Sequence, residues 1–447
     1  MFPIAIGRYR ALVMVGLSLV LAGTLWVRAQ TPPPPALDAT ASDPVTIGWM
    51  VGAPPPADKL IRFSDSSFYT FPQTRWAFSN MRQLVPTSVV RRGSGVVSPL
   101  PRAERADIDA VAFQPIGQSG SMTWAQSLGA NYTDGILVLH RGRVVYERYF
   151  GALAADRQHI AFSVTKSFVA TLAAMLVSEG RLDEQAPVSR YLPEVRGGGI
   201  GDATIRQLLD MTTGLDYSED YADEGSPVWD LGRAVGFLPR PKDYRGPESV
   251  FGYVPTLKKA YPHGERFSYK TPNTDTLGWV IRRVTNTPLS ELMRQRFWSV
   301  LGVEQDAFFT VDPLGVEFAG GGLNVTLRDL ARFGEMMRRG GRHGDRQVVP
   351  QAVVDDIRRG GNREQFAKAG YKTLPGWSYR SMWWVSHNAH GAYTARGIHG
   401  QAIYIDPTAE MVIARLASHP LGANVNMDPT SLPAYDAVAR HLMRAPQ

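Results

Sequence analysis

The sequence contains no cysteine among its 447 residues. This absence excludes disulfide frameworks, iron–sulfur clusters, Cys-ligated zinc and thiol nucleophiles. Any nucleophile must therefore be an oxygen or a nitrogen atom. The charge is nearly balanced as well: 48 Lys and Arg face 41 Asp and Glu, and no basic cluster concentrates the formal charge of +7. The composition therefore gives no reason to expect a nucleic acid or an anionic membrane as a partner.

Three common catalytic patterns are also missing. No serine lies in a G-x-S-x-G context, and the sequence has neither H-E-x-x-H nor G-x-x-x-x-G-K-[ST]. These absences exclude the nucleophile elbow, the zinc-metalloprotease helix and the P-loop. His387 and His390 lie three residues apart in a short polar segment, which we interpret as a solvated pair. The sequence predicts no metal site and no cofactor.

The first 29 residues have the pattern of an export signal. Arg8 and Arg10 precede an apolar run over residues 11–26, and Val27 and Ala29 fit the small residues of a cleavage site. Three of the basic residues and no acid lie in this segment, so its removal lowers the formal charge from +7 to +4. We expect an exported, periplasmic or secreted protein with no stable membrane association. The alternative is an uncleaved single-span anchor.

Composition divides the remaining chain into three parts. Residues 30–45 are rich in proline and predict a linker. Residues 46–120 predict an N-terminal extension packed on the core, because the stretch 63–81 is too aromatic to remain solvated. Residues 121–447 predict the main domain, with a mostly helical insertion at about 185–300.

Hydrophobic periodicity predicts the elements of the main domain. Two pairs of β-rich segments predict hairpins, at 136–150 and 403–414. Amphipathic stretches predict helices at 163–179, 203–210, 275–283 and 435–443, whereas 214–262 reads as loops. Strands near both ends with helices between them predict an α/β (α+β) domain, in which an antiparallel sheet is flanked by helices.

Ser163-Val164-Thr165-Lys166 is the strongest candidate for catalysis. The spacing i, i+3 puts the Ser163 hydroxyl and the Lys166 ammonium on one face of a helix. A hydroxyl is a poor nucleophile without an adjoining base, and a buried lysine with a lowered pKa can serve as that base. Free backbone N–H groups at the start of the helix are suited to stabilise an oxyanion.

Two further segments carry polar groups at the edges of predicted elements. Tyr269 immediately precedes a predicted helix, and we expect its phenol to share a proton with Lys166 and Ser163, as a phenolate favoured by the ammonium. Gly397-Ile398-His399-Gly400 leads into a strand, where glycine allows a ligand to approach the backbone. An inward N–H of that strand is a candidate second oxyanion donor.

In this order, the three segments resemble the penicillin-recognising serine hydrolases: the branch of class C β-lactamases, D,D-peptidases and S-x-x-K esterases, and most of all the nylon-oligomer (6-aminohexanoate-dimer) hydrolases. Further stretches support the resemblance, namely Pro-Val-Ser-Arg-Tyr-Leu-Pro at 187–193, Met-Thr-Thr-Gly-Leu at 211–215 and Gly-Gly-Leu-Asn-Val-Thr at 321–326. It implies a β-lactamase/D,D-peptidase-like fold and a hydrolase that cleaves a small amide or ester through an acyl-enzyme.

The resemblance implies a role for each matching residue. Ser163 would be the acylated nucleophile, Lys166 its base and Tyr269 the proton shuttle to the leaving group. The backbone N–H groups of Ser163 and Ala402 would hold the oxyanion. Five residues are expected to bind substrate: His399, Gln401, Asn273, Tyr221 and Trp384.

Two departures from the family pattern affect the expected substrate. Asn273 follows Tyr269 by four residues instead of two, and Gln401 stands where the third motif commonly ends in glycine. Because a glutamine side chain would crowd the strand edge, we expect penicillins to be disfavoured. The alternatives are a D-amino-acid peptidase, a weak class C-type β-lactamase and a non-catalytic ligand-sensing relative.

Overall fold

The computed structural model describes residues 36–444, so the predicted signal peptide and the linker up to residue 35 lie outside the described residues. Apart from Ala36, the described chain falls within one compact unit that begins at Leu37. Over this range no helix is both long enough and apolar enough to cross a membrane.

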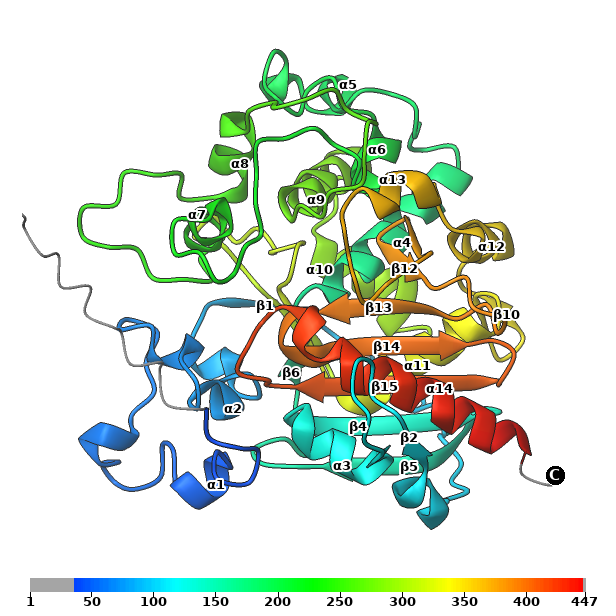
Figure 1. Cartoon of the computed structure of the whole chain (residues 1–447). Helices are drawn as coiled ribbons and strands as arrows, with labels where there is room; N and C mark the ends of the chain where they lie inside the picture. Colours follow the sequence, from blue (N-terminus) through cyan, green and yellow to red (C-terminus); the bar gives the residue numbers. More distant parts are fainter. Residues whose placement is uncertain (1–35, 445–447) are drawn as a thin grey trace, which may run out of the picture. The chain divides into compact units, whose positions relative to one another are not determined.

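A seven-stranded antiparallel sheet in the order β11-β12-β13-β14-β15-β4-β5 forms the centre of the molecule (Figure 1). Its strands are β4 (Thr133–His140), β5 (Arg143–Tyr149), β11 (Ser378–Arg380), β12 (Trp383–Val385), β13 (Tyr393–Gly397), β14 (Gln401–Asp406) and β15 (Met411–Ala417). Both predicted hairpins are present. The β4–β5 turn places Arg141 and Gly142 at φ 51° and 74°, as a tight two-residue hairpin requires. β15 pairs with β4, so the sheet joins both ends of the domain.

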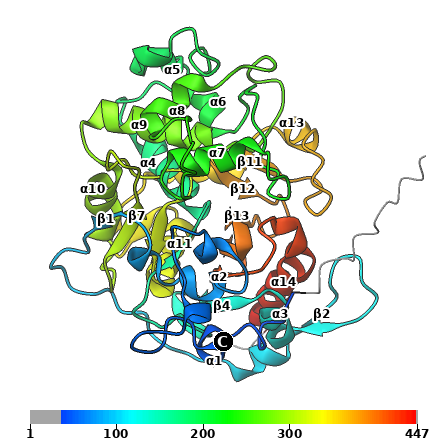
Figure 2. The same ribbon diagram turned by 90° about the vertical axis from the view of Figure 1, so that its left-hand side faces the viewer.

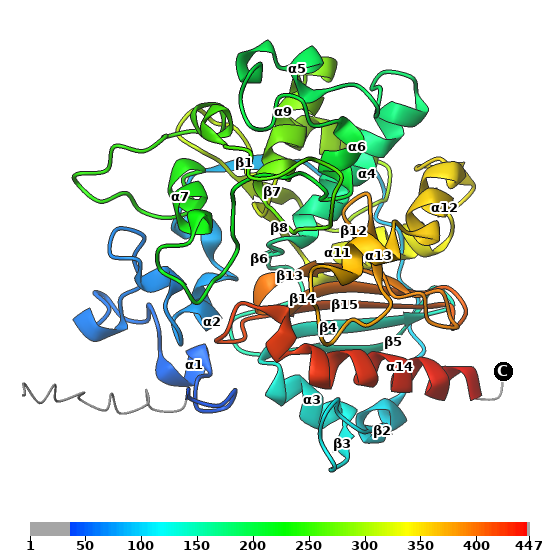
Figure 3. The same ribbon diagram turned by 45° about the horizontal axis from the view of Figure 1, so that its top comes forward.

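Alternating side chains of the sheet supply two hydrophobic layers. Ile136 and Val138 of β4 pack with α3 (Trp124–Ala130) and α14 (Asp428–Arg444) on one face. Leu137 and Leu139 belong to the larger core on the other face. That face carries α4 (Val164–Ser178) and α11 (Leu327–Arg338), which contact β13, β14, β15 and β4 (Figure 3). The α/β prediction is confirmed.

The regular elements of the chain between α4 and β7 (Ala307–Thr310) are all helices, and they stack above the sheet (Figure 2). Its helices are α5 (Val188–Tyr191), η5 (Pro193–Val195), α6 (Ile205–Leu209), α7 (Pro227–Ala234), α8 (Val250–Tyr253), η6 (Val254–Thr256), α9 (Pro272–Thr285), α10 (Leu289–Met293) and the π-helix η7 (Arg294–Trp298). The stretch 214–262, predicted as loops, is mostly irregular but also contains the short helices α7, α8 and η6. Each is at most eight residues long, too short for a clear periodic signal.

The N-terminal extension packs into the main core. Phe68 of η2 (Ser67–Tyr69) and Phe78, directly after α2 (Thr74–Ala77), are fully buried. Arg75 of α2 forms an ion pair of 3.1 Å with Asp134 of β4, and both side chains are at most 2% exposed. The extension also adds β1 (Thr87–Val90) to a second sheet of order β1-β7-β8-β6, with β6 (His159–Ile160) and β8 (Leu323–Val325).

The remaining elements are short. They are α1 (Pro44–Ile47), η1 (Ala57–Lys59), η3 (Met81–Gln83), η4 (Ala106–Ala110), β2 (Ala112–Phe113), β3 (Met122–Thr123), β9 (Arg342–His343), β10 (Arg346–Gln347), α12 (Gln351–Arg359), α13 (Arg363–Ala367), η8 (Ile398–Gly400) and η9 (Asn424–Asn426).

Candidate active site

Ser163 lies where the chain turns into α4. Phe162, the residue before it, has a φ of 43°, a conformation that a bulky side chain rarely adopts. The turn is fixed by backbone hydrogen bonds, in which Ala161 N–H donates to Leu323 O and Thr165 N–H donates to Phe162 O. Ser163 therefore lines a cavity although the residue is only 9% exposed.

Lys166 lies one helical turn further and contacts the nucleophile directly. Its Nζ donates to Ser163 Oγ at 3.0 Å and to the carbonyl oxygen of Gly320 at 2.6 Å. Burial lowers the pKa of Lys166 to about 8, although the carboxylates of Glu219 and Asp275 act in the opposite direction. A lysine with a pKa near neutrality can accept a proton from the serine hydroxyl.

Asp275, in the first turn of α9, is linked to Lys166 through the backbone of Gly320. Its Oδ1 accepts a hydrogen bond of 2.9 Å from Gly320 N–H, and the carbonyl of the same glycine accepts from Lys166. Burial raises the pKa of Asp275 to about 7, and the charge of Lys166 opposes that rise. Sequence reasoning missed Asp275, because five residues separate it from Tyr269 and no local motif marks it.

Tyr269 lies three residues before the start of α9 and faces both catalytic partners. Its ring stacks on Trp384 with a centroid distance of 5.6 Å, and Lys166 Nζ lies 5.1 Å from the ring centroid. Burial, together with the charge of Glu219, raises the pKa of Tyr269 well above its usual value, while a hydrogen bond with Ser163 lowers it. The expected phenolate is therefore wrong for the resting site, where Tyr269 is a neutral phenol able to donate a proton.

The second oxyanion donor is not at the predicted position. Ala402 lies on β14, whose backbone is paired with β13 on one side and β15 on the other, so its N–H does not face the cavity. Ile398 lines the cavity beside Ser163. Among residues 36–444, neither the N–H of Ser163 nor that of Ile398 has a hydrogen-bond acceptor. These two groups are the better candidates to bind an oxyanion.

Of the five predicted substrate-binding residues, two lie at the cavity. Tyr221 and Trp384 line it. Asn273 is fully buried and accepts a hydrogen bond of 2.7 Å from the Thr213 hydroxyl. Gln401 is buried too, because its amide donates to Ala417 O at 2.6 Å and accepts from Ala417 N–H at 2.9 Å.

His399 is the third predicted substrate-binding residue that lies away from this cavity. It is 6% exposed and packs among Tyr69, Phe78 and Phe162. The predictions for Asn273, Gln401 and His399 were therefore wrong. A turn with φ of 62° at His399 and 101° at Gly400 directs the side chains after Ile398 away from the cavity, which sequence spacing does not reveal.

The cavity beside Ser163 has a volume of about 460 Å³ and a mixed lining. Charged side chains of both signs reach it, namely Glu219, Asp220, Arg266, Lys368, Arg396 and Asp428. Glu219 is fixed between two donors: the Tyr221 hydroxyl at 2.6 Å and the N–H of Thr271. Sequence reasoning missed Glu219, because 214–262 was interpreted as loops of unknown shape.

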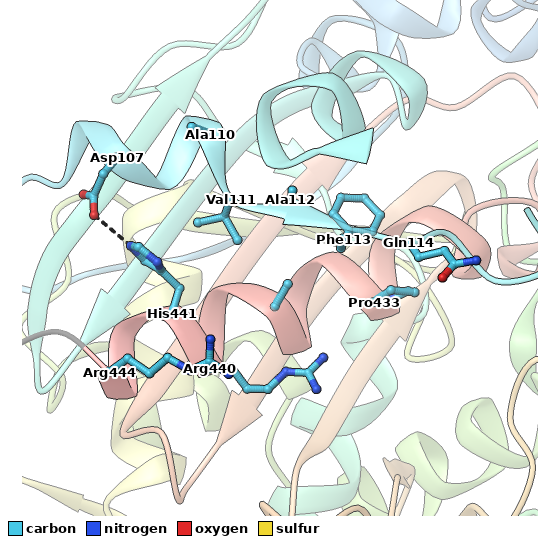
Figure 4. Close-up of a pocket in the computed structure, with 11 residues that line it drawn as sticks. Asp107, Ala110, Val111, Ala112, Phe113, Gln114, Pro433, Arg440, His441 and Arg444 are labelled. Atoms are coloured by element: carbon cyan, nitrogen blue, oxygen red, sulfur yellow. Dashed lines mark hydrogen bonds and ion pairs between the residues drawn. The ribbon is translucent and has the colours of Figure 1, made fainter. Parts of the chain in front are cut away.

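A larger cavity of about 660 Å³ lies on the other face of the sheet, between α14 and the segment from η4 to β2 (Figure 4). The side chains of Asp107 and His441 meet there at 2.7 Å. None of the predicted site residues lines this cavity. Within the described chain, no cluster of three or more His, Asp or Glu is arranged to hold a metal ion.

A serine that is hydrogen-bonded to a buried lysine at the start of a helix, with a tyrosine facing both, defines a serine hydrolase of the S-x-x-K type. A family model described as Beta-lactamase matches residues 125–432 of this chain. The chain belongs to the β-lactamase family, and it is a serine hydrolase.

Individual relatives are named as a hydrolase and an esterase. The chain is 36% identical over 355 residues to 6-aminohexanoate-dimer hydrolase of Paenarthrobacter ureafaciens, a match that covers 79% of this chain and 88% of the relative. It is 30% identical over 191 residues to esterase EstB of Burkholderia gladioli, covering 40% and 47%. A solved structure from Bacillus anthracis, provisionally named a 6-aminohexanoate-dimer hydrolase, superposes with a TM-score of 0.79 at 29% identity, covering 88% of this chain and all of that one.

Proposed function

We propose that this protein is an exported serine hydrolase that cleaves a small amide or ester through an acyl-enzyme on Ser163. The hydrogen bond of 3.0 Å from Lys166 Nζ to Ser163 Oγ, made by a buried lysine with a lowered pKa, is the observation that carries the proposal. The printed names of its relatives, a 6-aminohexanoate-dimer hydrolase and an esterase, support linear amides and carboxylic esters as substrates.

Acylation begins when Ser163 Oγ attacks the carbonyl carbon and its proton passes to neutral Lys166. The new oxyanion is held by the N–H groups of Ser163 and Ile398, which have no acceptor within the described chain. Collapse of the tetrahedral intermediate breaks the C–N or C–O bond, and the leaving atom takes a proton from the Tyr269 phenol. Lys166 returns its proton to Tyr269.

Deacylation follows the same path in reverse. Water attacks the acyl carbon, gives its proton to the Lys166 and Tyr269 pair, and Ser163 Oγ leaves and is reprotonated. Lys166 and Tyr269 are suited to both directions, because the lysine pKa is lowered towards neutrality while the tyrosine remains a neutral donor. The proposal needs no metal and no organic cofactor.

Gln401 does not crowd the strand edge and gives no reason to disfavour penicillins, because its side chain is hydrogen-bonded to Ala417 inside the sheet. A substrate panel therefore has to separate the related activities. Turnover of D-Ala-D-Ala peptides or nitrocefin in preference to linear amides and simple esters would favour a D-amino-acid peptidase or a β-lactamase. Failure of a fluorophosphonate probe to label Ser163 would favour a non-catalytic ligand-sensing relative.

The direct test of the reaction is Ser163→Ala assayed with p-nitrophenyl butyrate and a linear amide. We expect kcat/KM to fall by about a thousandfold or more, because the nucleophile and its base act as a unit. Unchanged hydrolysis would contradict the proposal. Export is tested separately by mass spectrometry of the mature N-terminus, which we expect to begin at Gln30.

A further inference from the structure

A second cavity meets the first at the nucleophile. It has a volume of about 50 Å³, against about 460 Å³ for the polar cavity, and Ser163, Tyr221 and Ile398 line both. The nucleophile therefore lies on the boundary between two spaces of different size. A substrate whose carbonyl carbon is at Ser163 Oγ can direct one group into each space.

The two linings differ in chemistry. The small cavity is lined mostly by aromatic and aliphatic side chains, including Phe162, Trp229, Phe237 and Phe318, and none of its lining residues is Asp, Glu, Lys, Arg or His. An ion in such surroundings loses its hydration without gaining a partner, which is strongly unfavourable. The small cavity is therefore suited to an uncharged group, whereas the large one offers both carboxylates and cations.

Tyr69, from the N-terminal extension, forms one wall of the small cavity. Its ring meets Phe237 edge-on at 5.5 Å and Trp229 at 6.1 Å. Its hydroxyl lies 3.3 Å from Nε2 of His399, and Nδ1 of that histidine lies 2.7 Å from the carbonyl of His419. A carbonyl can only accept, so Nδ1 carries the proton and Nε2 accepts from Tyr69. His399 thus orients Tyr69 and does not touch substrate.

The proton donor decides which half of the substrate occupies which cavity. Tyr269 lines the large cavity and not the small one. In the proposed function, on which this inference rests, Tyr269 gives its proton to the leaving atom. The leaving group must then extend into the large polar cavity, and the acyl group, on the opposite side of the carbonyl carbon, must extend into the small one.

We propose that the small aromatic cavity walled by Tyr69 is the acyl-binding site, and that the protein hydrolyses amides or esters of short, uncharged acyl groups with polar leaving groups. An acyl chain that ends in an ammonium group is a poor substrate, since none of the lining residues pairs with it. Long chains are poor substrates as well, because the cavity has a volume of only about 50 Å³.

The first test uses the wild-type protein and p-nitrophenyl esters of acetate, butyrate, hexanoate and decanoate, which share one leaving group. We expect kcat/KM to be highest for acetate or butyrate and to fall by about tenfold or more at decanoate. Hexanoyl and 6-aminohexanoyl p-nitroanilides form a second pair, for which we expect about a tenfold preference or more for the uncharged chain at pH 7. Equal turnover of butyrate and decanoate, or a preference for 6-aminohexanoyl, would overturn the proposal.

The second test enlarges the cavity. Phe237→Ala should raise the decanoate-to-butyrate ratio of kcat/KM by about fivefold or more. Trp229→Leu, at a partly exposed position that tolerates substitution better, should raise it in the same direction. Phe113→Ala is the matched control, because Phe113 is 8% exposed against 6% for Phe237 but belongs to the core on the other face of the sheet. An unchanged ratio in both cavity variants would refute the assignment.

Labelling of Ser163 distinguishes a failure of the acyl-site assignment from a failure of the proposed function. If a fluorophosphonate labels Ser163 and the Ser163→Ala variant is inactive, but chain length does not respond to the cavity variants, only the acyl-site assignment fails. If Ser163 is never labelled and Ser163→Ala retains activity, the proposed function fails, and the assignment fails with it.

Discussion

The buried ion pair between Arg75 and Asp134 is expected to hold the N-terminal extension on the domain. The side chains are 2% and 1% exposed, and Asp134 Oδ2 also accepts from the Ser418 hydroxyl at 2.5 Å. The change Arg75→Met removes the cation and leaves the Asp134 charge buried without it. Loss of one partner of such a pair costs about 3–5 kcal/mol, whereas removing both charges costs far less.

The assay is urea unfolding followed by tryptophan fluorescence and by circular dichroism. We expect Arg75→Met to lose about 3–5 kcal/mol of unfolding free energy, and the double variant Arg75→Met/Asp134→Asn to recover most of that loss. Arg283→Met is the control, because its pair with Glu194 is 43% exposed on both sides and should contribute less than about 1 kcal/mol. A loss of under about 1 kcal/mol for Arg75→Met, or no recovery in the double variant, would refute the reasoning.

Three further predictions concern the catalytic groups. Because Lys166 must be neutral to act as a base and burial lowers its pKa to about 8, kcat/KM for an ester should rise with pH through about 8 and then level off; a flat profile from pH 6 to 9 would contradict this. Asp275→Asn removes a charge that raises the Lys166 pKa, so the midpoint of the rise in kcat/KM should move to lower pH. A midpoint that stays in place or moves to higher pH would contradict the electrostatic coupling between Asp275 and Lys166. Asn273→Ala should cost about 1–2 kcal/mol in urea unfolding through its lost bond with Thr213 but leave KM within about twofold; a large rise in KM would return Asn273 to the substrate site.

Local sequence signals were sufficient for the parts of the fold that depend on neighbours along the chain. The β4–β5 hairpin has a short turn of Arg141 and Gly142 between two β-rich runs, and α4 has a continuous apolar pattern. The second sheet was missed because β6 and β8 contain two and three residues and pair across more than 150 positions of sequence. Such short strands carry too little pattern to be recognised.

In the candidate site, too, sequence signals identified the residues that are close along the chain and missed those that tertiary packing brings together. Ser163 and Lys166 share one helix, so their spacing alone brought them together. Asp275 reaches Lys166 only through Gly320, a contact that tertiary packing creates. The oxyanion donor was misplaced at Ala402, because a left-handed turn lies between it and Ile398 and changes which backbone groups face the cavity.

Rapid-quench mass spectrometry of the intact protein is the most direct test of a covalent acyl-enzyme on Ser163. After milliseconds with p-nitrophenyl butyrate, we expect a mass increase of one butyryl group, mapped by peptide analysis to Ser163 and absent from the Ser163→Ala variant. Steady turnover by the wild-type protein without any such adduct, or an adduct on another residue that persists in Ser163→Ala, would show that the reaction does not proceed through Ser163.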